Sequence, residues 1–445
     1  MLEFKLIHGK IYVVEVVIMQ YKKRVVDELI DLKTEVFCAI NIVGPKGSGK
    51  TTTAKQRSKT ILEFQNEDVR DNLLKIANTM PSKLLLNEKP ILFDEWQDAP
   101  KIWGSVRTYC DNNPEELGSF YLTGSSSKNV EIPHTGTLRI SKITMYPMSL
   151  YETGESNGTV SIKQLFDNPN SFDGCVSNTT FDDIVHAICR GGWPKYLIAK
   201  TKRGELLVAK ELYEQTYNVD ISKVDGVKRN PTIGRLLLQS YARNICTLAD
   251  NKTIIQDVNA NYSISEPTYF DYIDALEKLY IVQDIEAWCP AIRSKSAIRS
   301  GKKRNFVDPS IAVAALGVAP EYFNNDFKTL GFLFESLCIR DLKIYTSIND
   351  GHISYYHDRY GLEADGVLHL EDGRYALIEF KLGESEVEEG AKHLCEIERL
   401  VKEYNEKEKQ VPLRLPDLKI IITATQYGYR REDGVFVIPI GCLKD

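Results

Sequence analysis

One short segment limits what this chain can fold into more than any other, because a glycine-rich loop follows directly on an apolar run. Residues 36–44 are apolar and rich in β-branched side chains, and they lead into GPKGSGKT at residues 44–51. A buried strand, a glycine turn and then a helix, expected here over residues 51–65, let backbone N–H groups turn inward around an anion. A glycine turn with no ligand is the alternative, and the flanking strand and helix argue against it.

The order of residue types in this loop matches G-x-x-x-x-G-K-[ST], a pattern that binds the phosphates of a nucleoside triphosphate. Lys50 would neutralise the β- and γ-phosphate oxygens, and the hydroxyl of Thr51 would be a Mg²⁺ ligand. The positive end of the helix that begins at Lys50 would add to the field. We therefore expect ATP and Mg²⁺ as cofactors. The predicted binding residues are Gly44, Pro45, Lys46, Gly47, Ser48, Gly49, Lys50, Thr51 and Thr52.

A second apolar run, residues 91–93, ends in two acids and predicts the other half of this site. Asp94 would hold the metal through water, and Glu95 would polarise the attacking water. Alone, such a run often marks only a strand that reaches solvent, but a glycine-rich loop upstream favours the catalytic interpretation. A third expected strand, residues 119–122, leads to Thr123 and Ser125, one of which would contact the γ-phosphate or the water. A plain turn at the strand end is the alternative.

Strands separated by helical stretches predict an α/β fold with a parallel N-terminal sheet. Residues 156–182 are rich in Asn, Ser and Gly, which predicts a surface insertion. Residues 205–288 have a helical pattern, and a helix–turn–helix over 263–279 followed by a strand at 280–285 predicts a winged-helix module. The segment 293–304 is basic and could contact DNA phosphates, or it could be an ordinary solvated loop.

Composition and charge limit the class of protein without identifying it. Hydrophobic residues make up 43% and charged residues 27% of the chain, as in globular proteins with a buried core. The net charge of -6 argues against a generally basic coat for nucleic acid. The 9 cysteines contain no CxxC pair, and no apolar run is long enough to span a membrane. We therefore expect a cytoplasmic protein with free thiols and no membrane partner.

Several segments together resemble a known family. They are residues 93–100 with Trp103 and Arg107, and residues 122–126, 137–139, 147–152, 191–194 and 306–310. They resemble prokaryotic AAA+-type P-loop ATPases that are fused to a C-terminal domain of unknown function. The likeness begins near residue 21 and implies an arginine finger acting in trans, for which Arg139 is the candidate. Such a finger requires a homo-oligomer, whereas a surface arginine more commonly only pairs with an acid.

A second constellation lies near the C-terminus, where Glu379 and Lys381 are two residues apart and share one face of an expected strand. If the loop before this strand is 371–373 with Gly373 left-handed, Asp365 lies opposite Glu379, whereas a two-residue turn would separate the acids. Glu335 would arrive from the preceding helix.

This set of acids and lysine resembles the PD-(D/E)XK nuclease core. The resemblance implies that Asp365, Glu379 and Glu335 bind Mg²⁺ and that Lys381 orients the water for phosphodiester hydrolysis. An ordinary hairpin face with a Glu–Lys pair, or a nuclease-like fold without cleavage, are the alternatives.

These observations predict four regions. They are an N-terminal extension (1–20), a P-loop AAA+-type domain (21–200), a helical, winged-helix region (201–310) and a restriction-endonuclease-like α/β domain (311–445). The expected function is Mg²⁺-dependent ATP hydrolysis that drives a nucleic-acid-directed effector domain. One alternative is an ATP-regulated, Mg²⁺-dependent nuclease. Another is a non-catalytic nucleotide switch that binds a protein partner.

Overall fold

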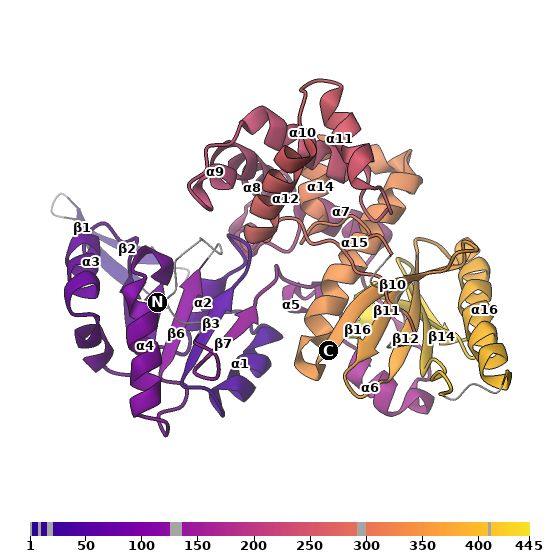
Figure 1. Cartoon of the computed structure of the whole chain (residues 1–445), viewed down its shortest axis with the longest axis horizontal. Helices are drawn as coiled ribbons and strands as arrows, with labels where there is room; N and C mark the ends of the chain where they lie inside the picture. The colour runs from indigo at the N-terminus through magenta and orange to yellow at the C-terminus, as the bar shows by residue number, and fades with distance from the viewer. Residues whose placement is uncertain (1, 8–9, 16–20, 125–135, 292–299, 408–410) are drawn as a thin grey trace.

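The computed structural model describes residues 2–7, 10–15, 21–124, 136–291, 300–407 and 411–445. Figure 1 shows two separate sheets, one on the left of the view and one on the right, with a group of helices above and between them. The predicted α/β class is confirmed: a parallel N-terminal sheet, a helical middle and a C-terminal α/β part are all present.

The N-terminal sheet is parallel throughout, in the order β4-β5-β6-β3-β7. Its strands are β3 (Ala39–Val43), β4 (Thr60–Glu63), β5 (Ile91–Asp94), β6 (Phe120–Gly124) and β7 (Ile140–Thr144). Strands β3, β5 and β6 consist mostly of buried apolar residues because helices cover both faces of the sheet. These helices are α1 (Val26–Thr34), α2 (Lys50–Lys55), α3 (Arg70–Thr79) and α4 (Lys101–Asn112).

Alternate residues of each strand pack on opposite sides of this sheet. Phe93 and Leu122 pack with α3 and α4, whereas Leu92 and Tyr121 pack with α1 and α2. Strand β6 lies between β3 and β5, so the carboxyl ends of these three strands meet at one edge. Polar residues that follow them are therefore brought together.

The helix predicted over residues 51–65 is shorter in the structure. Helix α2 ends at Lys55, and residues 60–63 form the edge strand β4, which pairs with β5. β-branched Thr60 and Ile61 suit a strand, and tertiary pairing outweighs the helical pattern.

The middle of the chain is a group of helices that lies above both sheets in Figure 1. They are α7 (Phe181–Arg190), α8 (Lys202–Gln215), a π-helix (Thr216–Asp220), α9 (Ile221–Lys223), α10 (Pro231–Arg243), α11 (Asn251–Asn259), α12 (Glu266–Lys278) and α14 (Pro309–Leu316). The predicted helix at 269–279 corresponds to α12, which Ser265 caps. The expected strand at 280–285 is reduced to two antiparallel bridges, Val282 with Phe306 and Ile285 with Lys303.

The C-terminal sheet is mixed, in the order β10-β11-β12-β13-β15-β14-β9. Its strands are β9 (Cys175–Val176), β10 (Gly351–His357), β11 (Glu363–Leu370), β12 (Tyr375–Lys381), β13 (Leu418–Thr423), β14 (Tyr427–Arg430) and β15 (Phe436–Pro439). Helices α15 (Phe327–Thr346) and α16 (Val387–Glu406) cover its opposite faces.

The prediction of a surface insertion at residues 156–182 is wrong. β8 (Val160–Ser161) pairs with the C-terminal strand β16 (Leu443–Lys444), and β9 joins the C-terminal sheet by pairing with β14. Helix α6 (Ile162–Asp167) buries Leu165 and Phe166 against the same core. Of its apolar side chains, Val160, Ile162, Leu165 and Phe166 are buried and Val176 is exposed, and the many polar residues between them obscure this pattern in the sequence.

The first residues form a hairpin of their own, β1 (Leu2–Ile7) with β2 (Lys10–Glu15). None of the helices in the described ranges combines the length and apolar character that crossing a bilayer requires.

Candidate functional site

The glycine-rich loop leaves β3 at the edge where the carboxyl ends of the central strands meet. Gly44 has a φ of 141°, and a Cβ built on it would lie 2.2 Å from the carbonyl oxygen of Met145. Only glycine fits there, because any side chain would collide with the backbone that follows β7. The sequence pattern therefore has a steric cause at this position.

Lys50 is buried inside the loop rather than extended into solvent. Its Nζ donates to the carbonyl oxygens of Gly44 at 3.0 Å and Pro45 at 2.8 Å. Burial lowers the pKa of Lys50 to about 8, although the charges of Glu95 and Asp94 act in the opposite direction. An anion that reached the loop would give this ammonium a stronger partner than two carbonyl dipoles.

Asp94 connects the loop to the neighbouring strands. Its Oδ1 accepts hydrogen bonds from the hydroxyls of Thr51 at 2.7 Å and Thr123 at 2.5 Å. Thr123 is in register with Ile42 on one side and Asp94 on the other, which places it between the loop strand and the acid.

The hydroxyl and carboxylate oxygens of Thr51 and Asp94 are hard ligands of the kind Mg²⁺ prefers, so the donor set fits that ion. Thr51 and Asp94 would hold the metal, which neutralises phosphate charge when bound. The other predicted sensor residue, Ser125, lies outside the described residues.

Glu95 adopts a left-handed backbone conformation, with φ 53° and ψ 49°. Its carboxylate accepts a hydrogen bond from the side-chain amide of the buried Gln97. Positive φ at a residue other than glycine is uncommon and is concentrated at functional sites. Gln97 lies within residues 93–100, which carry the family resemblance, but no role could be assigned to it from the sequence, since a glutamine two residues after the acids fits no general pattern.

Arg24 holds the phosphate loop against the segment that follows β7. Its guanidinium donates to the carbonyl oxygens of Ser48 and Tyr146, both at 2.9 Å, and its Nε lies 3.0 Å from Glu152 Oε1. Glu152 in turn forms a capping box with Ser149 at the start of α5 (Leu150–Thr153). The segment 147–152, which carries part of the family resemblance, thus holds Arg24, and Arg24 holds the phosphate loop at Ser48.

Helices of the middle region line a cavity of about 270 Å³ next to this loop. An ion pair of 3.5 Å between Lys46 and Asp220 links the loop to the π-helix. The lining residues are Lys46, Gln65, Glu95 and Gln97 from the first part, and Leu212, Thr216, Asp220, Lys223, Val224, Leu279 and Ile281 from the helices and the segment after α12. The site is thus built between the N-terminal sheet and the middle region.

Trp193 and Pro194 also lie against the loop. A Cβ built on Gly49 would be 3.4 Å from Pro194 Cγ, and one built on Gly47 would be 3.9 Å from Trp193 Cε3. The indole N–H of the buried Trp193 donates to Ser310 Oγ at 2.9 Å. The structure therefore brings together two of the segments that carried the family resemblance, 191–194 and 306–310.

Arg139 is not near its own chain's phosphate loop. Its backbone carbonyl bonds to Ala39 at the start of β3, whereas the loop follows the end of that strand roughly 16 Å away. Its side chain is half exposed and forms an ion pair of 2.6 Å with Asp111. The predicted role in trans is compatible with this position, and a role within the same chain is not.

In the C-terminal sheet, the predicted register of the second constellation is confirmed. Leu370 pairs with Arg374, Gly373 has a φ of 88°, and Gly366 is opposite Ile378, so that Asp365 lies opposite Glu379. Asp365 Oδ2 accepts a hydrogen bond from the backbone N–H of Phe380 at 3.1 Å.

One lysine of the basic segment, for which contact with DNA phosphates and an ordinary solvated loop were the two expectations, is buried among these acids. Lys303 Nζ lies 3.0 Å from Glu335 and 3.8 Å from Asp365, while Lys381 Nζ lies 2.7 Å from Glu379. Within the described part of the chain, no three His, Cys, Asp or Glu side chains are grouped as metal ligands. As arranged here, the predicted metal set Glu335, Asp365 and Glu379 does not fit a metal.

Burial raises the pKa of Glu335 and of Glu379 to about 8, and the charge of Asp365 adds to both shifts, while the lysines oppose them. Burial disfavours the charge of Lys303, but Glu335 and Asp365 outweigh it and raise its pKa.

The basic segment 293–304 is only partly available for phosphate contacts. Arg304 is buried and pairs with Asp284 at 2.7 Å, and Lys302 pairs with Glu286 at 3.2 Å. Arg293, Lys295 and Arg299 lie outside the described residues. Two of the six basic side chains of this segment, Lys303 and Arg304, are therefore internal partners rather than surface charges.

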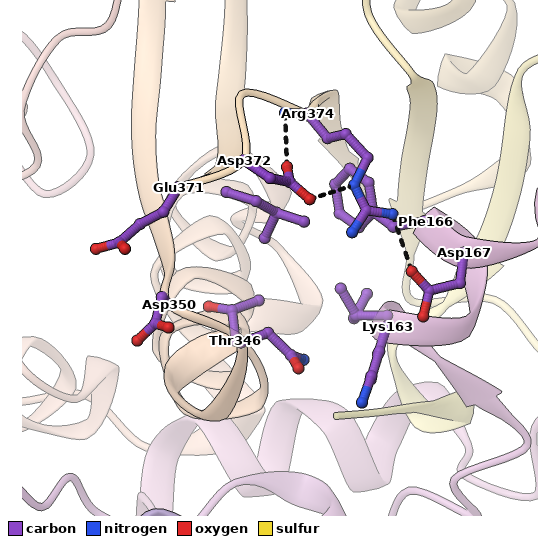
Figure 2. A pocket seen from close by; sticks show the side chains of 11 residues that line it. Lys163, Phe166, Asp167, Thr346, Asp350, Glu371, Asp372 and Arg374 are labelled. Atoms are coloured by element: carbon purple, nitrogen blue, oxygen red, sulfur yellow. Dashed lines mark hydrogen bonds and ion pairs between the residues drawn. The ribbon is translucent and has the colours of Figure 1, made fainter.

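A further cavity of about 300 Å³ lies between α6, the end of α15 and the 371–373 turn (Figure 2). Arg374 projects into it but pairs with Asp372 at 2.7 Å and Asp167 at 2.9 Å. It is remote from both clusters above, and its arginine is already neutralised, so we assign it no site.

Three family models match consecutive parts of the chain. Residues 37–154 match an AAA domain, residues 181–322 a domain of unknown function (DUF8612), and residues 330–443 a domain of unknown function (DUF4143). No curated protein matches the chain in sequence.

Among solved structures, the Walker-type ATPase of Pyrococcus abyssi is similar at 13% identity with a TM-score of 0.40, covering 66% of this chain and 96% of that chain. That likeness is too low to carry an argument. The AAA match and the loop geometry identify residues 37–154 as an AAA-type P-loop ATPase domain, followed by two domains of unknown function.

Proposed function

We propose that this protein binds ATP with Mg²⁺ at the loop of residues 44–52 and hydrolyses it, and that this cycle drives the C-terminal domain. One observation supports this site more than any other: Asp94 Oδ1 accepts hydrogen bonds from the hydroxyls of both Thr51 and Thr123. These two hydrogen bonds bring the phosphate loop (Thr51), the acid proposed to hold the metal (Asp94) and strand β6 (Thr123) together. The fold brings the ends of these strands together, but it does not require all three groups to be polar.

The proposed roles follow from these positions. Lys50 and the loop amides neutralise the phosphates, Thr51 and Asp94 hold the metal, and Glu95 polarises the attacking water. Thr123 contacts the γ-phosphate or that water. Catalysis then consists of positioning and charge stabilisation.

ATP turnover by the full chain tests these roles. Lys50→Ala should abolish hydrolysis, and Glu95→Gln should leave nucleotide binding intact while slowing hydrolysis about 10²- to 10⁴-fold. Lys59→Ala is the matched control, because Lys59 is an exposed lysine that pairs only with Glu88 in the described residues. Unchanged turnover in Lys50→Ala would remove the proposal.

Coupling to the C-terminal part has a physical route through buried hydrogen bonds. Gly192, next to Trp193, donates its N–H to Asp308 at 3.0 Å, and Arg340 on α15 pairs with Asp308 at 2.9 Å. Arg340 also holds Asp341 at 2.7 Å, and Asp341 accepts from the N–H of Leu150 at 2.9 Å. A shift of the phosphate loop against Trp193 would therefore change the hydrogen bonds and ion pairs that Arg340 and Asp341 make on α15.

Hydrogen exchange on the full chain tests this route. Adding ATP with Mg²⁺ should change amide protection in α15, and Trp193→Phe, which removes the indole donor to Ser310, should reduce that change. Trp288→Phe is the control, since Trp288 packs on Tyr375 in the C-terminal part. Identical protection of α15 with and without nucleotide would refute coupling by this path.

The proposed effector of ATP hydrolysis acts on nucleic acid. Helices α11 and α12, followed by the paired segments near 282 and 306, support a winged-helix module directed at DNA. A homo-oligomer is part of the same proposal, because Arg139 can serve only a neighbouring subunit's site.

An ATP-regulated nuclease is the second candidate, and the opposition of Asp365 and Glu379 favours it. For this activity Lys303 would first have to leave Glu335 and Asp365, because its ammonium lies between these acids. Plasmid or single-stranded DNA incubated with Mg²⁺ or Mn²⁺ would then be cleaved, and Asp365→Ala would abolish the cleavage. Cleavage that survives this substitution would belong elsewhere. Tight ATP binding with negligible hydrolysis despite an intact Glu95 would instead favour a nucleotide switch that binds a protein partner.

A further inference from the structure

The carboxylates of the C-terminal sheet already have a cation, and it comes from a distant part of the chain. Lys303 is 4% exposed and lies in the described part, 300–304, of the basic segment. Its backbone is fixed by two hydrogen bonds with Ile285, of 3.0 Å and 2.9 Å. Its ammonium lies over the ring of Tyr355, 5.5 Å from the centroid. The backbone pairing with Ile285 and the ring of Tyr355 therefore hold the Lys303 side chain in place.

The charges at this point are nearly balanced without any added ion. Glu335, Asp365 and Glu379 supply three carboxyl groups, and Lys303 and Lys381 supply two ammonium groups. One carboxyl oxygen, Glu379 Oε1, is buried and has no hydrogen-bond partner among the described residues, and His393 Nδ1 lies 3.8 Å from it. A cavity of about 700 Å³ opens beside Glu335, Asp365 and Lys381.

We propose that Lys303 is a tethered cation that takes the place of a divalent metal ion, so that the C-terminal domain in this conformation is closed to Mg²⁺. Glu335 and Asp365 are two of the three acids predicted to hold a metal, and the Lys303 ammonium lies within 4 Å of both. A metal entering there would have to displace a buried ammonium from its acids, which is strongly unfavourable unless that ammonium reaches other partners. This inference does not depend on ATP hydrolysis.

Mn²⁺ binding to the full chain without nucleotide, followed by electron paramagnetic resonance, tests the inference. The unmodified chain and Asp365→Asn should bind Mn²⁺ alike, because neither has an open site between Glu335 and Asp365. Lys303→Met should gain one Mn²⁺ site, at least tenfold tighter than any site of the unmodified chain, and the added substitution Asp365→Asn should remove it. Lys302→Met, which changes the adjacent exposed lysine, should gain nothing.

Thermal unfolding gives a second readout. Lys303→Met should lower the melting temperature, and Mn²⁺ should restore part of the loss, whereas Mn²⁺ should leave the unmodified chain unchanged. A folded Lys303→Met chain that gains no Mn²⁺ site would overturn the proposal. If that variant does not fold, an Mn²⁺ site in the unmodified chain that Asp365→Asn abolishes would overturn it, and equal binding by the two would support it.

Discussion

At the scale of single residues, the protonation of Lys50 depends on whether a phosphate occupies the loop. Without a ligand, its ammonium is buried and held only by the carbonyl oxygens of Gly44 and Pro45. Burial lowers its pKa to about 8, because the two carbonyls and the more distant acids do not replace water fully. Bound phosphates would favour the charged form and raise the pKa again.

This difference predicts a pH dependence of nucleotide affinity. Below pH 8 Lys50 is charged in both the free and the bound state, and its contribution to affinity is constant. Above pH 8 the free chain loses this proton while the complex keeps it, so binding must take up a proton, and affinity should fall by up to about tenfold per pH unit. Calorimetry with ADP and Mg²⁺ between pH 7.5 and 9.5, in buffers of different ionisation enthalpy, measures both effects. Constant affinity across this range would contradict the explanation.

At the scale of elements, the phosphate loop depends on a buried ion pair that ties the start of α1 to the capping box of α5. Arg24 and Glu152 have side chains that are 5% and 2% exposed, so neither charge is screened by solvent. Glu152 also accepts hydrogen bonds from the backbone N–H groups of Val25 and Ser149, one on each oxygen of its carboxylate. The loop thus rests on contacts made far from it in sequence.

Glu152→Gln should therefore destabilise the fold strongly. The amide keeps the shape but leaves the Arg24 charge buried without a counterion, which costs about 3 kcal/mol or more. Glu88→Gln is the control, because its pair with Lys59 is exposed on both sides and contributes little. Denaturant titration of both variants gives the comparison, and equal stabilities would show that the Arg24 pair has no such role.

Local patterns predicted some elements of this chain better than others. The glycine loop, the strand before Asp94 and the opposition of Asp365 and Glu379 follow from rules of local geometry, and the structure has them. The pairing of residues 160–176 with the C-terminal part and the burial of Lys303 depend on contacts between distant segments. A charged loop and a buried counterion have the same sequence pattern, so Lys303 could not be separated from its basic neighbours.

At the scale of the whole molecule, the middle region contacts both sheets, and the segments 191–194 and 306–310 meet beside the phosphate loop. In Figure 1, α15 stands between the two sheets. Asp341 on this helix accepts a hydrogen bond from the N–H of Leu150 at the start of α5, and Arg340 pairs with Asp341. In the proposed homo-oligomer, Arg139 would extend this arrangement beyond one chain. It lies at the edge of the N-terminal sheet opposite the loop, held by Asp111, and can reach a phosphate only on another subunit.

An arginine that acts in trans makes a prediction about mixed assemblies. Arg139→Ala should lower ATP turnover by about 10³-fold, in the range of other arginine fingers. Mixing it with Glu95→Gln, which is itself slow, should restore part of the turnover, because each Arg139→Ala subunit would receive its arginine from a neighbour. Asp111→Ala is the control, since it releases Arg139 without removing it. Mixtures no more active than the separate variants would argue that Arg139 is only the partner of Asp111.

In the proposed function, the loop of residues 44–51 binds a nucleotide through its amides and Lys50. Isothermal calorimetry of the full chain with ATP or ADP in the presence of Mg²⁺ tests it most directly. We expect saturable binding of one nucleotide per chain that Lys50→Ala weakens severely. No detectable uptake of either nucleotide by the folded, unmodified chain would contradict the account.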